Sequence, residues 1–167
     1  MKPQPTGTIL RTTDGYDLVV KRSFHAPIQD VWDSITNPTR TARWYGPWRG
    51  DASPGALIEI QMAYEDGEPW FPMRIDVCDP PRRLAVTQIE EAGDWRIELL
   101  LKEDAGTTEL RLFQHLDSGQ HVGSIGPGWE YYMDMLGASR EGRPLPKFDD
   151  YRWQHTHFEE ALHAIQV

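Results

Sequence analysis

The sequence lacks several features that would place it in a familiar class. Its one cysteine, Cys78, can form neither an intrachain disulfide nor a cysteine cluster for zinc. No apolar run is long enough to span a bilayer, and the opening residues MKPQPT lack the apolar centre of a secretion signal. We therefore expect a cytoplasmic protein that does not insert into a membrane.

Positive charge is also scarce. The chain has 167 residues, with 17 Lys and Arg against 26 Asp and Glu, which gives a net charge of -9. A chain of this sign is repelled by phosphate backbones and by anionic lipid surfaces. Nucleic acid is therefore not an expected partner. The length suits one domain with a substantial core, followed by a tail.

The motifs of common enzymes and metal sites are missing as well. There is no Gly-rich phosphate loop after a strand, no serine in a nucleophile elbow and no zincin motif. The densest group of potential metal ligands matches no known spacing and is more typical of a solvated helix. We expect no metal and no cofactor. This group consists of His155, His157, Glu159, Glu160 and His163.

The first part of the chain predicts a hairpin followed by two short helices. Residues 8–13 and 16–24 resemble two strands joined at Asp14-Gly15, a dipeptide typical of tight turns with positive backbone angles. Apolar residues recur at helical spacing over 27–36. Asn37-Pro38 ends this helix and can cap a second short one.

From residue 57 to about 116 the apolar period changes to two, which predicts an antiparallel meander covered on one face. The inward phase of the strand over 83–90 stays open, because its apolar residues do not alternate cleanly. Elsewhere the alternation places one set of apolar side chains on the inner face. They are Ile58, Ile60, Met62, Met73, Ile75, Val77, Trp95, Ile97, Leu99, Leu110 and Leu112.

A long helix follows the meander and ends near Gly142. Pro127 leaves its start open, since proline can begin a helix or kink one. A sheet with one apolar face needs a cover, and this helix is the long amphipathic segment available to lie across it. We expect one domain over residues 1–142, with a linker and a tail helix over 143–167.

The order of these elements resembles the SRPBCC superfamily of START-like, pollen-allergen-like helix-grip proteins. Within it, the chain resembles the branch of homologues of the activator of heat-shock chaperone ATPase. The resemblance covers roughly residues 7–142. It implies an α+β helix-grip fold, in which a curved antiparallel sheet wraps around a long C-terminal helix, with two short helices after the first hairpin. The motifs are APIQDVW (26–32), NPTR (37–40), PPRRL (80–84), TTEL (107–110) and GWEYYMD (128–134).

The superfamily includes lipid and hormone carriers, polyketide cyclases and chaperone activators, so the resemblance implies a fold more than an activity. The inner face carries almost no titratable side chain apart from Tyr132, which argues against general acid-base catalysis. We therefore assign no catalytic residue and predict a pocket for a small apolar molecule, although the same residues could fill a solid core. The predicted lining is Trp44, Trp48, Ile60, Met62, Met73, Ile75, Trp95, Ile97, Leu112, Gln114, Trp129, Tyr132, Met133 and Leu136.

The leading hypothesis is thus a non-catalytic, hydrophobic-ligand-binding protein, with lipids among the candidate ligands. One alternative is a cyclase-like or hydrolytic enzyme that uses His115 or Tyr132 to move a proton. The other, implied by the resemblance alone, is a stress-response protein with a chaperone partner. A homodimer stays open.

Met73→Arg tests the predicted pocket. The charged side chain should fill it, and binding of an apolar ligand should be lost. Burying an unpaired charge should also lower the free energy of unfolding by several kcal/mol, about 3 or more. Ligand titration and chemical denaturation measure the two effects, and normal binding in a folded variant would place the site elsewhere.

Overall fold

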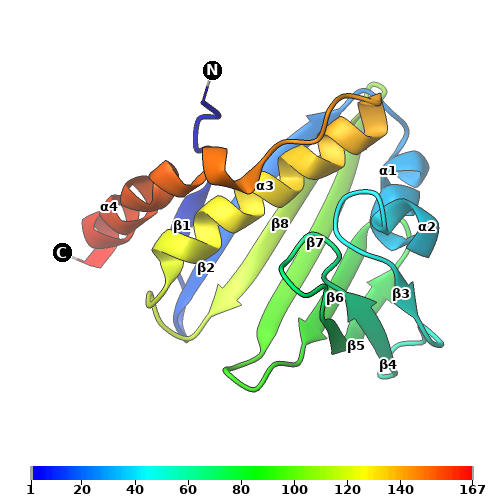
Figure 1. Cartoon of the computed structure of the whole chain (residues 1–167), viewed down its shortest axis with the longest axis horizontal. Helices are drawn as coiled ribbons and strands as arrows, with labels where there is room; N and C mark the ends of the chain where they lie inside the picture. Colours follow the sequence, from blue (N-terminus) through cyan, green and yellow to red (C-terminus); the bar gives the residue numbers. More distant parts are fainter. Residues whose placement is uncertain (1, 167) are drawn as a thin grey trace.

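The computed structural model describes residues 2–166 and shows a curved sheet with a long helix across one face (Figure 1). Eight antiparallel strands follow the order β1-β2-β8-β7-β6-β5-β4-β3, and the sheet does not close into a barrel. The predicted α+β helix-grip architecture is confirmed. The strands are β1 (Thr8–Arg11), β2 (Tyr16–Phe24), β3 (Trp48–Arg49), β4 (Leu57–Gln61), β5 (Trp70–Asp79), β6 (Arg83–Gln88), β7 (Trp95–Asp104) and β8 (Thr107–Leu116).

The first hairpin forms as predicted, but Gly15 is required there for a different reason than the one expected. Gly15 does not adopt a positive φ, so the expected turn geometry is wrong. A Cβ atom at this position would lie 2.0 Å from the carbonyl oxygen of Leu116. Glycine is therefore required because β2 and the end of β8 approach each other closely there.

Two short helices, α1 (Ile28–Thr36) and α2 (Pro38–Thr41), follow β2. The side chain of Asn37 accepts hydrogen bonds from the backbone amides of Thr39 at 2.9 Å and Arg40 at 3.3 Å, so it caps α2 as predicted. Trp44 and Trp48 come directly after these helices. The helices therefore position both indoles at one end of the sheet.

A β-bulge in β5 changes the inward phase of this strand. The register shifts between Ile75 and Val77, so Cys78 faces the same side as Ile75. The prediction that Val77 faces inward is wrong for this reason. In β6, whose phase the sequence left open, Leu84 and Val86 point inward.

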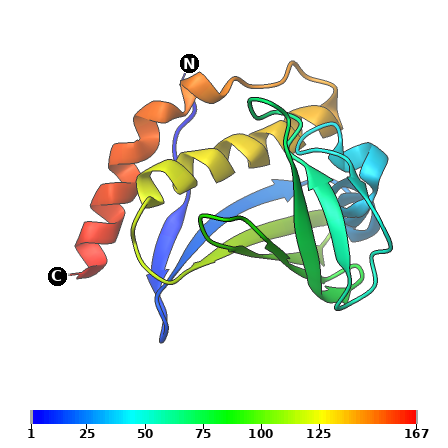
Figure 2. The same ribbon diagram turned by 60° about the horizontal axis from the view of Figure 1, so that its bottom comes forward.

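Helix α3 (Val122–Glu141) is the long helix, and it begins at Val122 with Pro127 inside it. It packs on β2, and the C-terminal helix α4 (His155–Gln166) contacts both α3 and β1. Figure 2 shows the sheet curling upward beneath α3. None of the helices described here has the length and apolar character that a bilayer span needs.

The C-terminal segment is fastened to the rest of the chain by Phe158. It follows two short 3-10 turns, Phe148–Asp150 and Arg152–Gln154, and its side chain is completely buried. A Cβ atom on Gly126 would lie 2.4 Å from the Phe158 ring, and one on Gly7 would lie 2.8 Å from it. The ring therefore fits because both neighbours are glycines. The boundary between domain and tail at residue 142 stays a prediction.

A buried ionic network joins both ends of the chain to α3. The carboxylate of Glu130 is fully buried and pairs with the Arg22 guanidinium at 3.0 Å. It also accepts hydrogen bonds from the backbone amides of Thr6 and Gly7. Arg22 pairs in addition with Asp134 at 3.0 Å, which accepts a 2.6 Å hydrogen bond from the Tyr151 hydroxyl of the C-terminal segment.

Phe158→Ala should release the tail helix. Removing a fully buried ring should lower the free energy of unfolding by about 3–5 kcal/mol. Leu145→Ala, at a side chain that is 41% exposed in the linker, is the matched control and should change it by less than about 0.5 kcal/mol. Urea denaturation measures both, and equal stability of the two variants would mean that α4 is not held by this ring.

Candidate functional site

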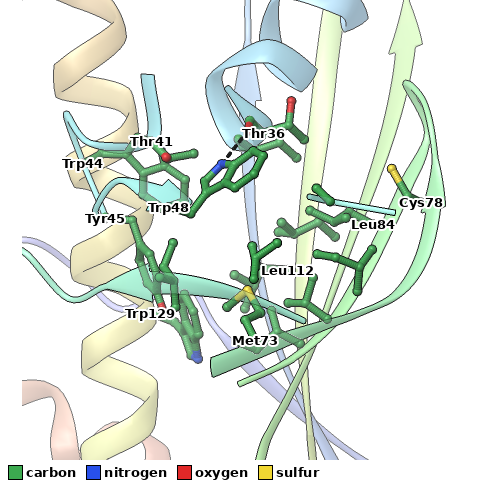
Figure 3. A pocket seen from close by; sticks show the side chains of 18 residues that line it. Thr36, Thr41, Trp44, Tyr45, Trp48, Met73, Cys78, Leu84, Leu112 and Trp129 are labelled. Atoms are coloured by element: carbon green, nitrogen blue, oxygen red, sulfur yellow. Dashed lines mark hydrogen bonds between the residues drawn. The ribbon is translucent and has the colours of Figure 1, made fainter. Parts of the chain in front are cut away.

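An apolar cavity of about 130 Å³ lies between α3 and the curled half of the sheet (Figure 3). The side chains that line it come from the α1–α2 region, from β3 to β8 and from α3. Nearly all of the lining is hydrocarbon or aromatic, with Thr36 and Thr41 as the polar exceptions. The remaining lining residues are Ile35, Trp44, Tyr45, Trp48, Ala52, Ile58, Ile60, Met73, Ile75, Cys78, Leu84, Val86, Ile97, Leu99, Leu112 and Trp129.

We call this space the inner cavity. The indole rings of Trp44 and Trp48 present only their apolar surfaces to it. Trp44 Nε1 donates to the carbonyl of Ser34 at 2.9 Å, and Trp48 Nε1 donates to the carbonyl of Thr36 at 2.8 Å. Both carbonyls lie near the C-terminal end of α1, where helix carbonyls have no partner within the helix. The helix end therefore holds the rings, and no indole N–H remains to attract water.

Tyr45 and Trp129 form a wall between the inner cavity and a second, larger hollow. Their rings stack with centroids 6.1 Å apart and planes within 3° of parallel. The Tyr45 hydroxyl donates to Gln88 Oε1 at 3.0 Å, and Trp129 Nε1 donates to Gln114 Oε1 at 2.6 Å. Both glutamines are buried, so they fix the two rings from behind.

The second hollow, which we call the outer groove, has a volume of about 720 Å³ and a mixed lining. It runs between α3, the strand ends around β4 to β7, and the segment just before α4. The Tyr132 hydroxyl donates to Glu65 Oε1 at 2.8 Å across it. The lining residues are Tyr45, Met62, Tyr64, Glu65, Asp66, Pro69, Phe71, Gln88, Glu90, Trp95, Ser124, Ile125, Gly128, Trp129, Tyr131, Tyr132, Lys147, Phe148, Asp149 and Arg152.

The tyrosine hydroxyls of this region do not ionise readily. Burial, reinforced by the negative charges of Glu90 and Glu65, raises the pKa of Tyr45 far above its usual value of 10. Burial and then the hydrogen bond to Glu65 raise the pKa of Tyr132 in the same direction. Both groups therefore act as hydrogen-bond donors, and neither is suited to releasing a proton near neutral pH.

The structure places the predicted lining residues in four different positions. Met62, Trp95 and Tyr132 line the outer groove, while Gln114 lies behind Trp129. Met133 and Leu136 line neither hollow, and both are completely buried in the packed core. The inner cavity takes Trp44, Trp48, Ile60, Met73, Ile75, Ile97, Leu112 and Trp129.

Sequence reasoning missed several lining residues, each for a definable reason. The inward orientation of Cys78 depends on the bulge in β5. That of Leu84 and Val86 depends on how β6 pairs with its neighbouring strands. Tyr45 follows the predicted residue Trp44 directly, and its aromatic character indicates the same position near the cavity mouth. Glu65 lies in a turn, where no periodicity shows which way a side chain points.

His115 lies outside both hollows, on the convex face of the sheet. Its Nδ1 is 2.6 Å from Asp17 Oδ1, and its Nε2 is 3.5 Å from Glu98 Oε1. It lines neither the cavity nor the groove. Over residues 2–166, His, Cys, Asp and Glu side chains do not gather in any group of three that could hold a metal ion.

Comparison with known proteins adds a family and several structural relatives. Residues 25–139 match the sequence model of the family described as activator of Hsp90 ATPase homolog 1-like protein. No curated protein sequence matches the chain. The crystal structure of CalU16 from Micromonospora echinospora is similar, with 26% identity, a TM-score of 0.77 and coverage of 96% of this chain and 98% of that one.

Two further structures share the fold at lower identity. A protein encoded by a Bordetella parapertussis gene, BPP1335, is 20% identical, with a TM-score of 0.73 over 95% of this chain and 94% of that one. DynU16, encoded in the dynemicin biosynthetic locus, is 22% identical, with a TM-score of 0.67 over 79% of this chain and 50% of that one. Both likenesses concern the fold alone.

The wall residue Tyr45 should make the protein sensitive to alkali. Above about pH 10 a tyrosine in the unfolded chain ionises, whereas Tyr45 stays neutral in the fold, so stability falls as the pH rises further. This effect reaches about 1.4 kcal/mol per pH unit once the unfolded tyrosine is ionised. It is absent well below pH 10, where the side chain is neutral in both states.

Urea unfolding of wild type and Tyr45→Phe between about pH 8 and 11 measures this effect. The variant should be less stable at pH 8 by about 1–3 kcal/mol, because Gln88 Oε1 loses its donor. As the pH rises further, the free energy of unfolding of the variant should fall less than that of wild type. The variant lacks one tyrosine that stays neutral in the folded state. If the free energy of unfolding falls equally with pH in the two proteins, Tyr45 is not the source of the alkali sensitivity.

Proposed function

Because the chain belongs to the family of activator of Hsp90 ATPase homolog 1-like proteins, we propose that it uses the cavity of this fold to bind a small apolar molecule. The apolar part of the ligand occupies the inner cavity, and the rest extends past Tyr45 and Trp129 into the outer groove. The protein acts by holding this molecule and shielding it from water, without a chemical step.

One observation carries this proposal: the inner cavity is apolar and the polar atoms of the aromatic residues around it already bind protein groups. Such a cavity gains nothing from holding water and favours hydrocarbon. An engineered apolar cavity of about 150 Å³ accommodates benzene. At about 130 Å³, the inner cavity matches a ligand group of one ring or a short branched chain.

The same geometry disfavours the enzymatic alternative. The inner cavity offers the hydroxyls of Thr36, Thr41 and Tyr45 and the thiol of Cys78, and none of its lining residues is a histidine or a carboxylate that could activate them. The raised pKa of Tyr45 also prevents it from serving as an acid or base near neutral pH. Tyr132 and Glu65 meet in the outer groove, where they are already bonded to each other. A chaperone partner, a homodimer and a cytoplasmic location stay predictions.

Filling the cavity tests the proposal. Ile97→Phe adds volume inside the inner cavity and should weaken binding of propylbenzene, an uncharged single-ring probe, by at least about tenfold, or 1.4 kcal/mol. Unfolding free energy should change by less than about 1.5 kcal/mol, because the added ring occupies empty space. Ligand-observed NMR titration and urea denaturation measure the two quantities.

Val77→Phe is the control, since it also replaces a β-branched side chain with a phenyl ring on the same sheet, but outside the cavity. It should leave propylbenzene binding unchanged. If wild type does not bind propylbenzene, or if Ile97→Phe binds it as well as wild type does, the inner cavity is not the site.

A further inference from the structure

The outer groove is lined by largely buried aromatic rings together with carboxylates. We propose that it selects ligands that carry an ammonium group beside their apolar ring, in preference to neutral or acidic ligands of the same shape. This inference rests on the proposed function and names the class of ligand that the site takes. It follows from three features of the groove: its aromatic surfaces, the placement of its carboxylates and the positions of its few cations.

Four aromatic rings lie next to one another along one side of the groove. The ring centroid of Tyr132 lies 4.9 Å from that of Tyr45 and 5.1 Å from that of Tyr131, and Tyr131 lies 5.5 Å from Phe148. The negative faces of such rings attract a cation, and aromatic cages are a common means of recognising ammonium groups. A neutral ligand would gain only packing from the same surfaces.

Two of the carboxylates are held against these rings by hydrogen bonds. Glu65 accepts the Tyr132 hydroxyl at 2.8 Å. Glu90 accepts the Gln88 amide at 2.8 Å, and Gln88 in turn accepts the Tyr45 hydroxyl at 3.0 Å. Both aromatic residues are therefore linked to an acidic group of the groove. A ligand ammonium near the rings is close to both negative charges.

No Lys or Arg within residues 2–166 forms an ion pair with Glu65, Asp66 or Glu90, so these charges are available to a ligand. The arginine of the lining, Arg152, pairs with Asp149 at 2.8 Å. Lys147 is the remaining cation of the lining. The field near Tyr45 and Tyr131 is negative, since Glu65 raises the pKa of both hydroxyls, in addition to the larger effect of burial.

Three probes of matched shape distinguish the contribution of ligand charge to affinity from that of apolar packing. Phenethylamine, propylbenzene and hydrocinnamate each carry one phenyl ring on a chain of two carbons, which ends in an ammonium, a methyl or a carboxylate group. Wild type should bind phenethylamine about tenfold more tightly than propylbenzene, and hydrocinnamate most weakly. The preference should shrink as salt increases, because the groove is open to water.

The variants Glu65→Gln and Glu90→Gln keep the size and the hydrogen-bond acceptor of each side chain. Each should lower the affinity for phenethylamine several-fold more than the affinity for propylbenzene, so the preference between the two probes should shrink. Glu91→Gln removes one negative charge next to Glu90 at an exposed residue outside the groove, and it should preserve the wild-type preference. Titrations by calorimetry and ligand-observed NMR provide the three affinities for each protein.

Equal binding of the three probes by wild type would overturn the ammonium preference and leave the proposed apolar site intact. A preference that survives in Glu65→Gln and Glu90→Gln would also overturn it, because the charge selection would then come from elsewhere. Failure of all three probes to bind would contradict the proposed function itself.

Discussion

A straight helix cannot stay in contact with a sheet that curls across its full width, and this mismatch creates the site. Helix α3 packs on β2, and its residues Met133 and Leu136 are completely buried. Towards β4 to β7 the sheet curls, and the bulge in β5 adds to its bend. Side chains from both surfaces then meet only partly, and the inner cavity is the space left between them.

The alternation in the sequence was sufficient to place Met73, Ile75 and Ile97 on the concave face, because a one-sided sheet imposes a period of two. It could not place Cys78, since a bulge inserts one residue without a periodic signal. The helical spacing of apolar residues placed Met133 and Leu136 on the same face of the helix as Trp129. Only the position of α3 on the sheet decides which of these three residues face the cavity. Long-range packing sets that position, and local pattern does not.

Two buried polar side chains position the aromatic wall between the cavity and the groove. Gln88 and Gln114 are buried among apolar side chains, where an unpaired amide would be costly, and each accepts a hydrogen bond from one ring of the wall. Such bonds restrict the two stacked rings to one orientation. A binding site built this way gains specificity from shape and from the charges at its rim, rather than from polar groups inside it.

The segment that matches the family, residues 25–139, omits the three residues that hold the buried carboxylate of Glu130. Arg22 and the amides of Thr6 and Gly7 lie before that segment, and Phe158 of the tail lies after it. A protein trimmed to the matching residues would retain an uncompensated negative charge on α3 next to a bare apolar strip. Such a fragment should precipitate rather than fold, so expression work on this family member requires both flanking segments.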